Sequence, residues 1–160
     1  PGERTLGQQM TDESIETKAK VNITAASEGY DYGHFSVVSY NGFVLLVGQV
    51  SSDELKSLAT NVVRKIEDVR RIYNELEIGE ATGAGTRTND TWITTQVKSK
   101  LLASSDTPGT RVKVVTENSV VYLMGLLTEA EADRVALEAA EVSGAKRVVQ
   151  LFELIPAPAI

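Results

Sequence analysis

The chain has no cysteine and a single histidine, His34. The missing cysteine excludes disulfide bonds and thiolate chemistry, and one histidine cannot supply the ligand set of a zinc site. His34 comes directly before a predicted strand, and the acids near it, Glu28 and Asp31, are poorly spaced for a hard cation. We therefore predict that the protein binds no metal and no cofactor.

Catalytic motifs are also missing. Serine and threonine are plentiful, but a nucleophile needs a positioned base, for which there is only one histidine, and no G-x-S-x-G elbow presents a serine. The pair Gly83-x-Gly85 lacks the third glycine and the preceding strand of a dinucleotide-binding turn. Acid pairs such as Asp12-Glu13 fall where we predict the first turn of a helix, so capping and the helix dipole explain them. We predict that the protein is not an enzyme.

The sequence lacks long apolar runs and an excess of basic residues. No apolar segment is long enough for a membrane span. The 16 Lys and Arg residues are outnumbered by 22 Asp and Glu, giving a formal net charge of −6. This argues against nucleic-acid binding, which needs a basic surface. Contact with a membrane would therefore be peripheral and would need a local patch with inserted apolar groups. The start at Pro1-Gly2, without an apolar leader, is expected of a mature or trimmed chain.

The sequence does contain an internal repeat. The pattern Asp12, Ile15, Ala19, Ile23 returns 78 positions later as Asp90, Ile93, Val97, Leu101. Gly48 matches Gly125, and Ser51-x-x-Glu54 matches Thr128-x-x-Glu131, both at a step of 77. Arg71-Ile72-Tyr73-Asn74 matches Arg147-Val148-Val149-Gln150 at a step of 76. Such close agreement indicates a duplication, with a period too long for a solenoid unit.

Each copy has the order helix, strand, strand, helix, strand. In the first copy, Asn41-Gly42 predicts a type I′ turn between two strands, and Ser51-x-x-Glu54 predicts a capping box. The third strand must join in parallel through a right-handed crossover. We predict an α+β protein of two tandem αββαβ units, each a three-stranded mixed sheet with two helices on one face. The predicted segments are a flexible lead (1–10), the first unit (11–78), a Gly-containing linker (79–88), the second unit (89–155) and a tail (156–160).

The second strand of each copy has two unusual properties. Residues 43–47 and 120–124 are apolar without alternation, which indicates that both sheet faces are covered. We therefore expect the two units to pack together. Gly48 and Gly125 interrupt these strands, where glycine weakens packing. A β-bulge or a close approach of two backbones is the favoured explanation, and a ligand contact is the alternative.

The segment 89–102 predicts a helix with two usable faces. Asn89 or Asp90 is a candidate N-cap, and Ile93, Val97 and Leu101 recur as a core face. The opposite stripe starts at Trp92, the only tryptophan, and continues through Thr95, Gln96, Ser99 and Leu102, with Lys98 and Lys100 beside it. Trp92 could close the edge of the core or pack on a neighbouring domain. Alternatively, it could be an exposed anchor for a membrane or a protein partner. Its counterpart in the first copy is Ser14, and that of Leu102 is Thr24.

The repeated unit resembles the BON domain. The resemblance is carried by residues 41–50 and 117–127, by the helix after each, and by the closing segments 71–74 and 142–148. It extends over about residues 11–155. The first copy departs from it, because Asp68 or its neighbour stands where the second copy has Gly144. Residues 89–95 and 121–125 add a similarity to the outer-membrane lipoproteins of Gram-negative bacteria that carry two BON domains.

This resemblance implies a periplasmic protein at the inner leaflet of the outer membrane, held by an N-terminal acyl anchor whose cysteine this chain does not contain. It also implies binding to anionic phospholipid such as phosphatidylglycerol, support of outer-membrane integrity, and no catalysis. Lipid contact in such proteins is assigned to the first helix of the second BON unit, which here corresponds to Trp92, Thr95, Gln96, Lys98, Ser99 and Leu102. The alternative is a protein-interaction module that binds an outer-membrane assembly factor through the same Trp92 face. We expect the first unit to be structural or partner-facing.

Overall fold

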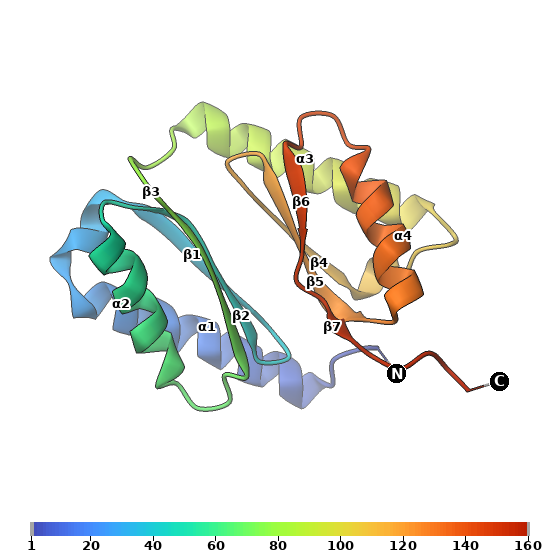
Figure 1. Cartoon of the computed structure of the whole chain (residues 1–160), viewed down its shortest axis with the longest axis horizontal. Coiled ribbons are helices and arrows are strands. Elements are labelled where there is room, and N and C mark those ends of the chain that lie inside the picture. The colour runs from blue at the N-terminus through green and yellow to red at the C-terminus, as the bar shows by residue number, and fades with distance from the viewer. Residues whose placement is uncertain (1, 160) are drawn as a thin grey trace. The chain divides into compact units, whose positions relative to one another are not determined.

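A computed structural model describes residues 2–159, which form two compact units (Figure 1). Residues 4–82 make the first unit, and residues 83–159, together with residues 2 and 3, make the second. The first unit contains α1 (Leu6–Ala26), a short 3₁₀ helix η1 (Glu28–Tyr32), β1 (His34–Tyr40), β2 (Phe43–Val50), α2 (Asp53–Arg64) and β3 (Arg71–Ile78). The second contains α3 (Ala84–Ala103), η2 (Gly109–Arg111), β4 (Val112–Glu117), β5 (Val120–Leu127), α4 (Glu129–Ala140), β6 (Arg147–Gln150) and β7 (Glu153–Leu154).

The two sheets have the predicted topology. In the first, β1 pairs antiparallel with β2, and β3 pairs parallel with β2. The second sheet has the same order, but its last strand is divided into β6 and β7, so it counts four strands rather than the predicted three. Both pieces pair with β5 in one register, Val120 with Arg147 and Leu126 with Glu153. The predicted α+β fold of two tandem αββαβ units is confirmed.

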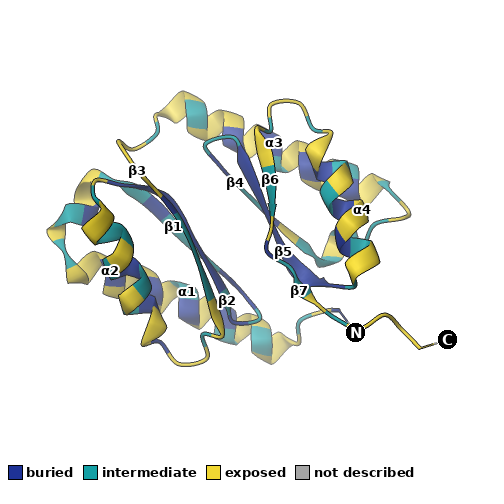
Figure 2. Ribbon diagram, viewed as in Figure 1, coloured by how far each residue is buried: buried dark blue, intermediate teal, exposed yellow. Residues whose placement is uncertain are grey.

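Each unit has its own core between its sheet and its two helices. In the second unit, the predicted face Ile93, Val97 and Leu101 is almost completely buried and meets Ala132, Val135 and Ala139 of α4. The first unit uses Ile15, Ala19 and Ile23 of α1 in the same way. Figure 2 shows these buried residues as dark blue bands on the helices. Both helices of a unit therefore cover one sheet face, as predicted. The expectation that the units pack on each other stays a prediction.

The helix starts differ from the prediction. Helix α1 begins at Leu6, inside the segment predicted to be a flexible lead, because Thr5 and Gln8 form a capping box. Helix α3 begins at Ala84, inside the predicted linker, with Gly83 as its N-cap. The predictions that Asn89 or Asp90 caps α3 and that Asp12-Glu13 opens α1 are therefore wrong.

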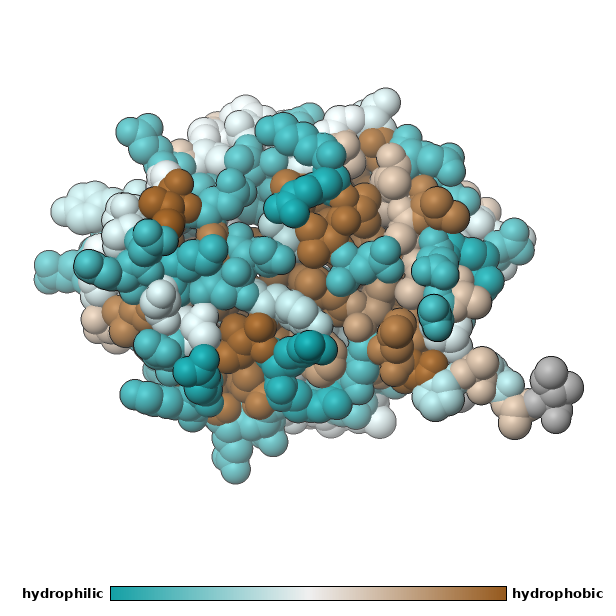
Figure 3. Space-filling view, in the orientation of Figure 1, coloured by the Kyte–Doolittle hydropathy of each residue, from teal (hydrophilic) through white to brown (hydrophobic). Residues whose placement is uncertain are grey.

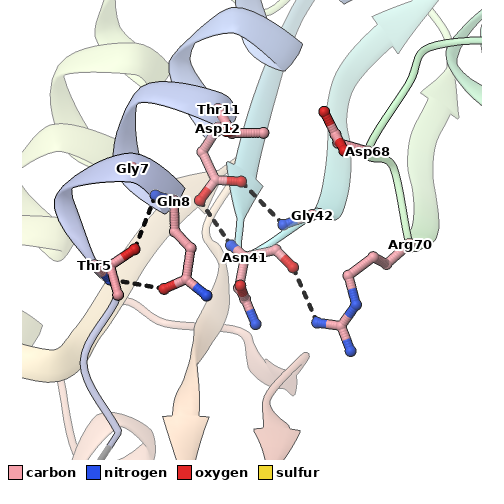
Figure 4. Close-up of a pocket in the computed structure, with 9 residues that line it drawn as sticks. All are labelled: Thr5, Gly7, Gln8, Thr11, Asp12, Asn41, Gly42, Asp68 and Arg70. Atoms are coloured by element: carbon pink, nitrogen blue, oxygen red, sulfur yellow. Dashed lines mark hydrogen bonds between the residues drawn. The ribbon is translucent and has the colours of Figure 1, made fainter.

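The aspartates have another role, since each reaches the hairpin turn of its own unit. Asp12 is buried within α1 and accepts hydrogen bonds from the backbone N–H groups of Asn41 (2.7 Å) and Gly42 (2.9 Å) (Figure 4). It also accepts from the Ser39 hydroxyl at 2.7 Å, and Arg4 pairs with it at 3.0 Å. A buried carboxylate needs such donors. The carboxylate thus ties the helix to a turn about 30 positions away.

Other local predictions can be checked in the same way. Asn41 and Gly42 have φ of 51° and 80°, which confirms a turn with two left-handed residues. The capping box of Thr128 and Glu131 is confirmed, whereas α2 is capped by Ser52 and not by Ser51. The N–H of Leu55 donates to the Ser52 hydroxyl, but a leucine side chain cannot accept a bond in return. The predicted capping box of Ser51 and Glu54 is therefore wrong, and α2 has a simple serine cap.

The in-strand glycines mark close backbone approaches. At Gly48 a Cβ atom would lie 2.0 Å from the carbonyl oxygen of His34, and φ is +122°. At Gly125 it would lie 2.7 Å from the carbonyl oxygen of Arg111. The pairing of β1 with β2 runs through Gly48 without an extra residue, so a bulge is excluded there. At the exits of α2 and α4, Asp68 (φ 73°) and Gly144 (φ 91°) share the left-handed conformation despite their different side chains.

Candidate functional site

The outward face of α3 holds every residue predicted to contact lipid. Trp92 is 48% exposed and Leu102 is 61% exposed, and Trp92 is not part of the hydrophobic core. The interpretation that Trp92 closes the edge of the core is therefore wrong, and packing on a neighbouring domain stays a prediction. The other four predicted residues are exposed as well: Thr95, Gln96, Lys98 and Ser99. At about 100° per residue, Trp92, Ser99, Thr95 and Leu102 occupy one continuous band of the helix surface, away from the core face.

The hydroxyl groups on this face are not equally available to a ligand. Thr95 donates its hydroxyl proton to the carbonyl oxygen of Thr91 at 3.0 Å, and Thr91 donates to Arg87 in the same way at 3.1 Å. Such bonds within a helix are common for threonine. In this arrangement the Thr95 oxygen can accept a hydrogen bond from a glycerol hydroxyl. It would have to break its own bond before donating to a phosphate oxygen.

Cationic side chains flank the exposed band on both sides. Lys98 and Arg87 are exposed and lie on one flank, about three helical turns apart. Lys100 lies on the other flank, where it contacts Glu141 (3.1 Å) and Glu138 (3.7 Å) of the neighbouring helix α4 and its end. The hydrogen bond to Glu141 is the main reason that the pKa of Lys100 is raised above its usual value. Its positive charge is therefore retained and partly neutralised within the protein.

A groove of about 570 Å³ runs beside Trp92. One wall is α3, through Trp92, Gln96, Ser99 and Lys100, and the other is the chain that leaves α4, through Glu141, Val142 and Ser143. The residues of the second wall were not predicted, because they are about 50 positions from Trp92 and no local pattern connects them. The first unit has a groove at the equivalent place.

The groove of the first unit differs in size and lining. It measures about 220 Å³ and is lined by residues that include Ser14, Lys18, Glu67 and Asp68. Ser14 replaces Trp92, so the aromatic group is missing. Two apolar side chains of α1, Leu6 (73% exposed) and Met10 (63% exposed), lie before this position. They were not predicted as an exposed pair, because the helix was expected to start only at residue 11.

Another hollow, of about 440 Å³, lies beside the start of α1 (Figure 4). Its wall includes Asp12, Asn41 and Arg70. These groups bind one another: the Asp12 carboxylate holds the turn, and the Arg70 guanidinium donates to the carbonyl oxygen of Asn41 at 3.1 Å. The polar groups of this hollow therefore stabilise the hairpin.

The surface, the helices and the acidic side chains were compared with what an apolar patch, a membrane span and a metal site require. In the face seen in Figure 3, apolar residues form separate patches among hydrophilic ones. Between residues 2 and 159, no helix has the length and apolarity needed to cross a bilayer. Over the same residues there is no group of three or more histidine or acidic side chains that could hold a metal ion.

Comparison with known proteins identifies the family. Residues 11–80 and 89–156 each match the BON domain. The chain is 40% identical to the 21 kDa hemolysin of Actinobacillus pleuropneumoniae, over 95% of this chain and 78% of that protein. It is 37% identical to the outer membrane lipoprotein DolP of Haemophilus influenzae, over 95% and 79%. It is 30% identical to the osmotically-inducible protein Y of Escherichia coli, over 89% and 72%. The chain therefore belongs to the BON domain family and carries two copies of the domain in tandem.

Proposed function

We propose that this protein is a non-catalytic envelope protein that binds anionic phospholipid through helix α3 of its second BON domain. The observation that carries the proposal is the exposed pair Trp92 and Leu102 on a helix whose opposite face forms the core. A large aromatic group that is half exposed next to polar residues suits the boundary between lipid headgroups and acyl chains. The similarity to the outer membrane lipoprotein DolP supports the same direction.

The proposed cellular place follows from that relative. We place the protein in the periplasm, at the inner leaflet of the outer membrane, where it would support the integrity of that membrane. An acyl anchor would fit the weakness of the surface proposed here, because one small apolar patch gives only marginal membrane binding and stable attachment usually takes two signals.

In the proposed docking mechanism, apolar and charged side chains make different contacts with the membrane. The Trp92 ring enters the headgroup boundary, and Leu102 adds apolar contact about three turns further along α3. Lys98 and Arg87 face the lipid phosphates from one flank and offset the acidic character of the whole chain locally. Each such cation contributes about 1 kcal/mol near an anionic surface. Binding should therefore require anionic lipid and weaken as salt rises.

A second candidate function uses the same surface. An exposed tryptophan is also a common anchor in protein interfaces, so the Trp92 face could bind an outer-membrane assembly factor. The two functions differ in what they require. Lipid docking depends on headgroup charge and needs no second protein. If the face binds only a protein partner, the chain does not bind vesicles.

Co-sedimentation with vesicles tests the proposal. The protein should bind phosphatidylglycerol-containing vesicles and not purely phosphatidylcholine ones. Leu102→Ala should weaken binding about tenfold, because the membrane no longer buries the leucine side chain. Trp92→Ala should weaken binding further, because its side chain is larger. Leu137 is a matched control, since it is 67% exposed on α4, and Leu137→Ala should bind as the unmodified protein does. Equal binding by folded Trp92→Ala protein would refute lipid docking through α3.

A further inference from the structure

The groove beside Trp92 is lined by neutral polar groups, by Lys100 and by the Glu141 carboxylate that pairs with it. Gln96 and Ser99 come from α3, and Ser143 comes from the chain after α4, so donors and acceptors stand on both walls. Lys100 is the one cation among the residues that line the groove. Once Glu141 is displaced from Lys100, such a lining suits a ligand with one negative charge and several hydroxyl groups.

Two glutamates hold Lys100 at the edge of this groove. The ammonium group lies 3.1 Å from a carboxylate oxygen of Glu141 and 3.7 Å from one of Glu138. The side chains are accessible, with 64% of Glu141 and 35% of Lys100 exposed. Ion pairs at such exposed sites contribute little to stability, because water screens both charges. An incoming anion can therefore replace a carboxylate without unfolding any part of the protein.

We propose that this groove is the headgroup site of an anionic glycerophospholipid, whose phosphate displaces Glu141 from Lys100. The inference deepens the lipid-docking function proposed above and rests on it. Insertion of the Trp92 ring into the headgroup boundary brings the groove beside the ring to the depth of the phosphates. The phosphate then takes the place of one carboxylate beside Lys100, and the glycerol hydroxyls of phosphatidylglycerol bond to Gln96, Ser99 and Ser143.

The same lining explains selection between headgroups. A choline group is a permanent cation without N–H or O–H donors, so it leaves the amide and hydroxyl groups of the groove unpaired and places positive charge near Lys100. These groups are exposed to water in the free protein, and a ligand that covers them without bonding to them removes their water and gives nothing in return. A glycerol headgroup has no charge of its own and can satisfy those groups. The groove therefore favours phosphatidylglycerol over phosphatidylcholine beyond the simple attraction of charge.

The two glutamates act in this scheme as internal competitors. Because Glu141 occupies the place that the phosphate needs, the affinity for an isolated lipid stays low. A surface rich in anionic lipid offers many phosphates and overcomes the competition. Removing the carboxylate should therefore strengthen binding, which is the opposite of what a merely structural ion pair would do.

Vesicle binding by the full chain tests this scheme with three charge variants. Glu141→Gln removes the competing carboxylate and should bind phosphatidylglycerol vesicles about fivefold more tightly, the effect of about one unit of charge near the surface. Lys100→Gln removes the ammonium group that binds the lipid phosphate, and this variant should bind the vesicles about fivefold more weakly. Glu129→Gln is the matched control, since it removes the same charge from the first turn of α4 and not from its end. It should bind within about twofold of the unmodified protein, because its charge lies away from the groove.

Each outcome decides between defined alternatives, provided that thermal unfolding shows all variants to be folded. The headgroup site is supported if the affinity for the vesicles is highest for Glu141→Gln, lower for the unmodified protein and lowest for Lys100→Gln. If Trp92→Ala abolishes binding while both groove variants bind like the unmodified protein, lipid docking stands and the headgroup site is refuted. If Glu129→Gln gains as much as Glu141→Gln, the effect is one of net charge, and the groove has no special role. If the unmodified protein binds no anionic vesicles, both proposals fall.

Discussion

Asp90, inside helix α3, accepts a hydrogen bond at 2.8 Å from the backbone N–H of Asn118, in the turn between β4 and β5. The other carboxylate oxygen accepts from the N–H of Ser119, also at 2.8 Å. Asp12 has the same relationship to Asn41 and Gly42 in the first unit. The duplication therefore preserved a link from helix to hairpin, and this link fixes the orientation of the helix that carries Trp92.

Replacing this carboxylate should destabilise the second unit. Asp90→Ala leaves two backbone N–H groups of the turn without their acceptor, and the expected loss in free energy of unfolding is about 3 kcal/mol. Asp133→Ala, at an exposed position of α4, is the control and should change the free energy by less than about 0.5 kcal/mol. Urea unfolding followed by circular dichroism measures both. An equal unfolding midpoint for the two variants would show that the link is unimportant.

The close approach at Gly48 predicts a sharp difference between two glycines. Gly48→Ala places a methyl group against the His34 carbonyl in a left-handed backbone conformation, and we expect a loss of more than about 3 kcal/mol or an insoluble protein. Gly85 lies in α3 with no atom near its added Cβ position. Gly85→Ala should therefore stabilise the protein by up to about 1 kcal/mol. Thermal melting of both variants checks the prediction, which would be wrong if Gly48→Ala melted no earlier than the unmodified protein.

Ser119 should be a place where glycine is the better residue. Its φ is 67°, and the first unit has Gly42 at the corresponding turn position, with φ of 80°. Because side chains are strained in this region, Ser119→Gly should stabilise the protein by about 0.5–1 kcal/mol, and the N–H that bonds Asp90 is kept. Ser36→Gly, in the middle of β1, should instead destabilise it by a similar amount. A lower melting temperature for Ser119→Gly would contradict the argument.

The capping box of α4 should make stability depend on pH. Desolvation acts to raise the pKa of Glu131, but hydrogen bonds from the Thr128 N–H and the Arg111 guanidinium outweigh it and lower this pKa. A lowered pKa means that the folded protein favours the ionised carboxylate. The stabilisation is therefore complete above the pKa of the unfolded chain and is lost as pH falls through the folded value. Glu131→Gln should cost about 1 kcal/mol at neutral pH and nothing in strong acid. Urea unfolding at several pH values measures the difference, and a cost that did not change with pH would count against the mechanism.

The fold could be predicted from the sequence because its signals are local and occur twice. The spacing of Ile93, Val97 and Leu101 defines a helix face, and Asn41-Gly42 defines a hairpin. The starts of α1 and α3 could not be found in this way, because Asp12 and Asp90 look like caps until their partners in distant turns are known. Helix preference alone does not separate an N-cap aspartate from one inside a helix.

Only the part of the candidate site that lies on α3, the helix of Trp92, was predicted from the sequence. The stripe of α3 follows from helical spacing, and all six residues predicted to contact lipid are exposed. The second wall of the groove comes from the end of α4, and the pairing of Lys100 with Glu138 and Glu141 depends on how two helices pack. Sequence spacing within one helix contains no information about either. For the same reason, the exposed Leu6 and Met10 became visible only once the true start of α1 was known.

The fluorescence of Trp92 tests the central claim most directly. The chain contains one tryptophan, so its emission reports the surroundings of this side chain alone, and a half-exposed ring gives emission typical of a wet environment. We predict that phosphatidylglycerol vesicles shift the emission to shorter wavelength and protect it from quenching by iodide, whereas phosphatidylcholine vesicles do neither. Vesicles that bind the protein while the emission of Trp92 stays unchanged would show that α3 does not enter the membrane.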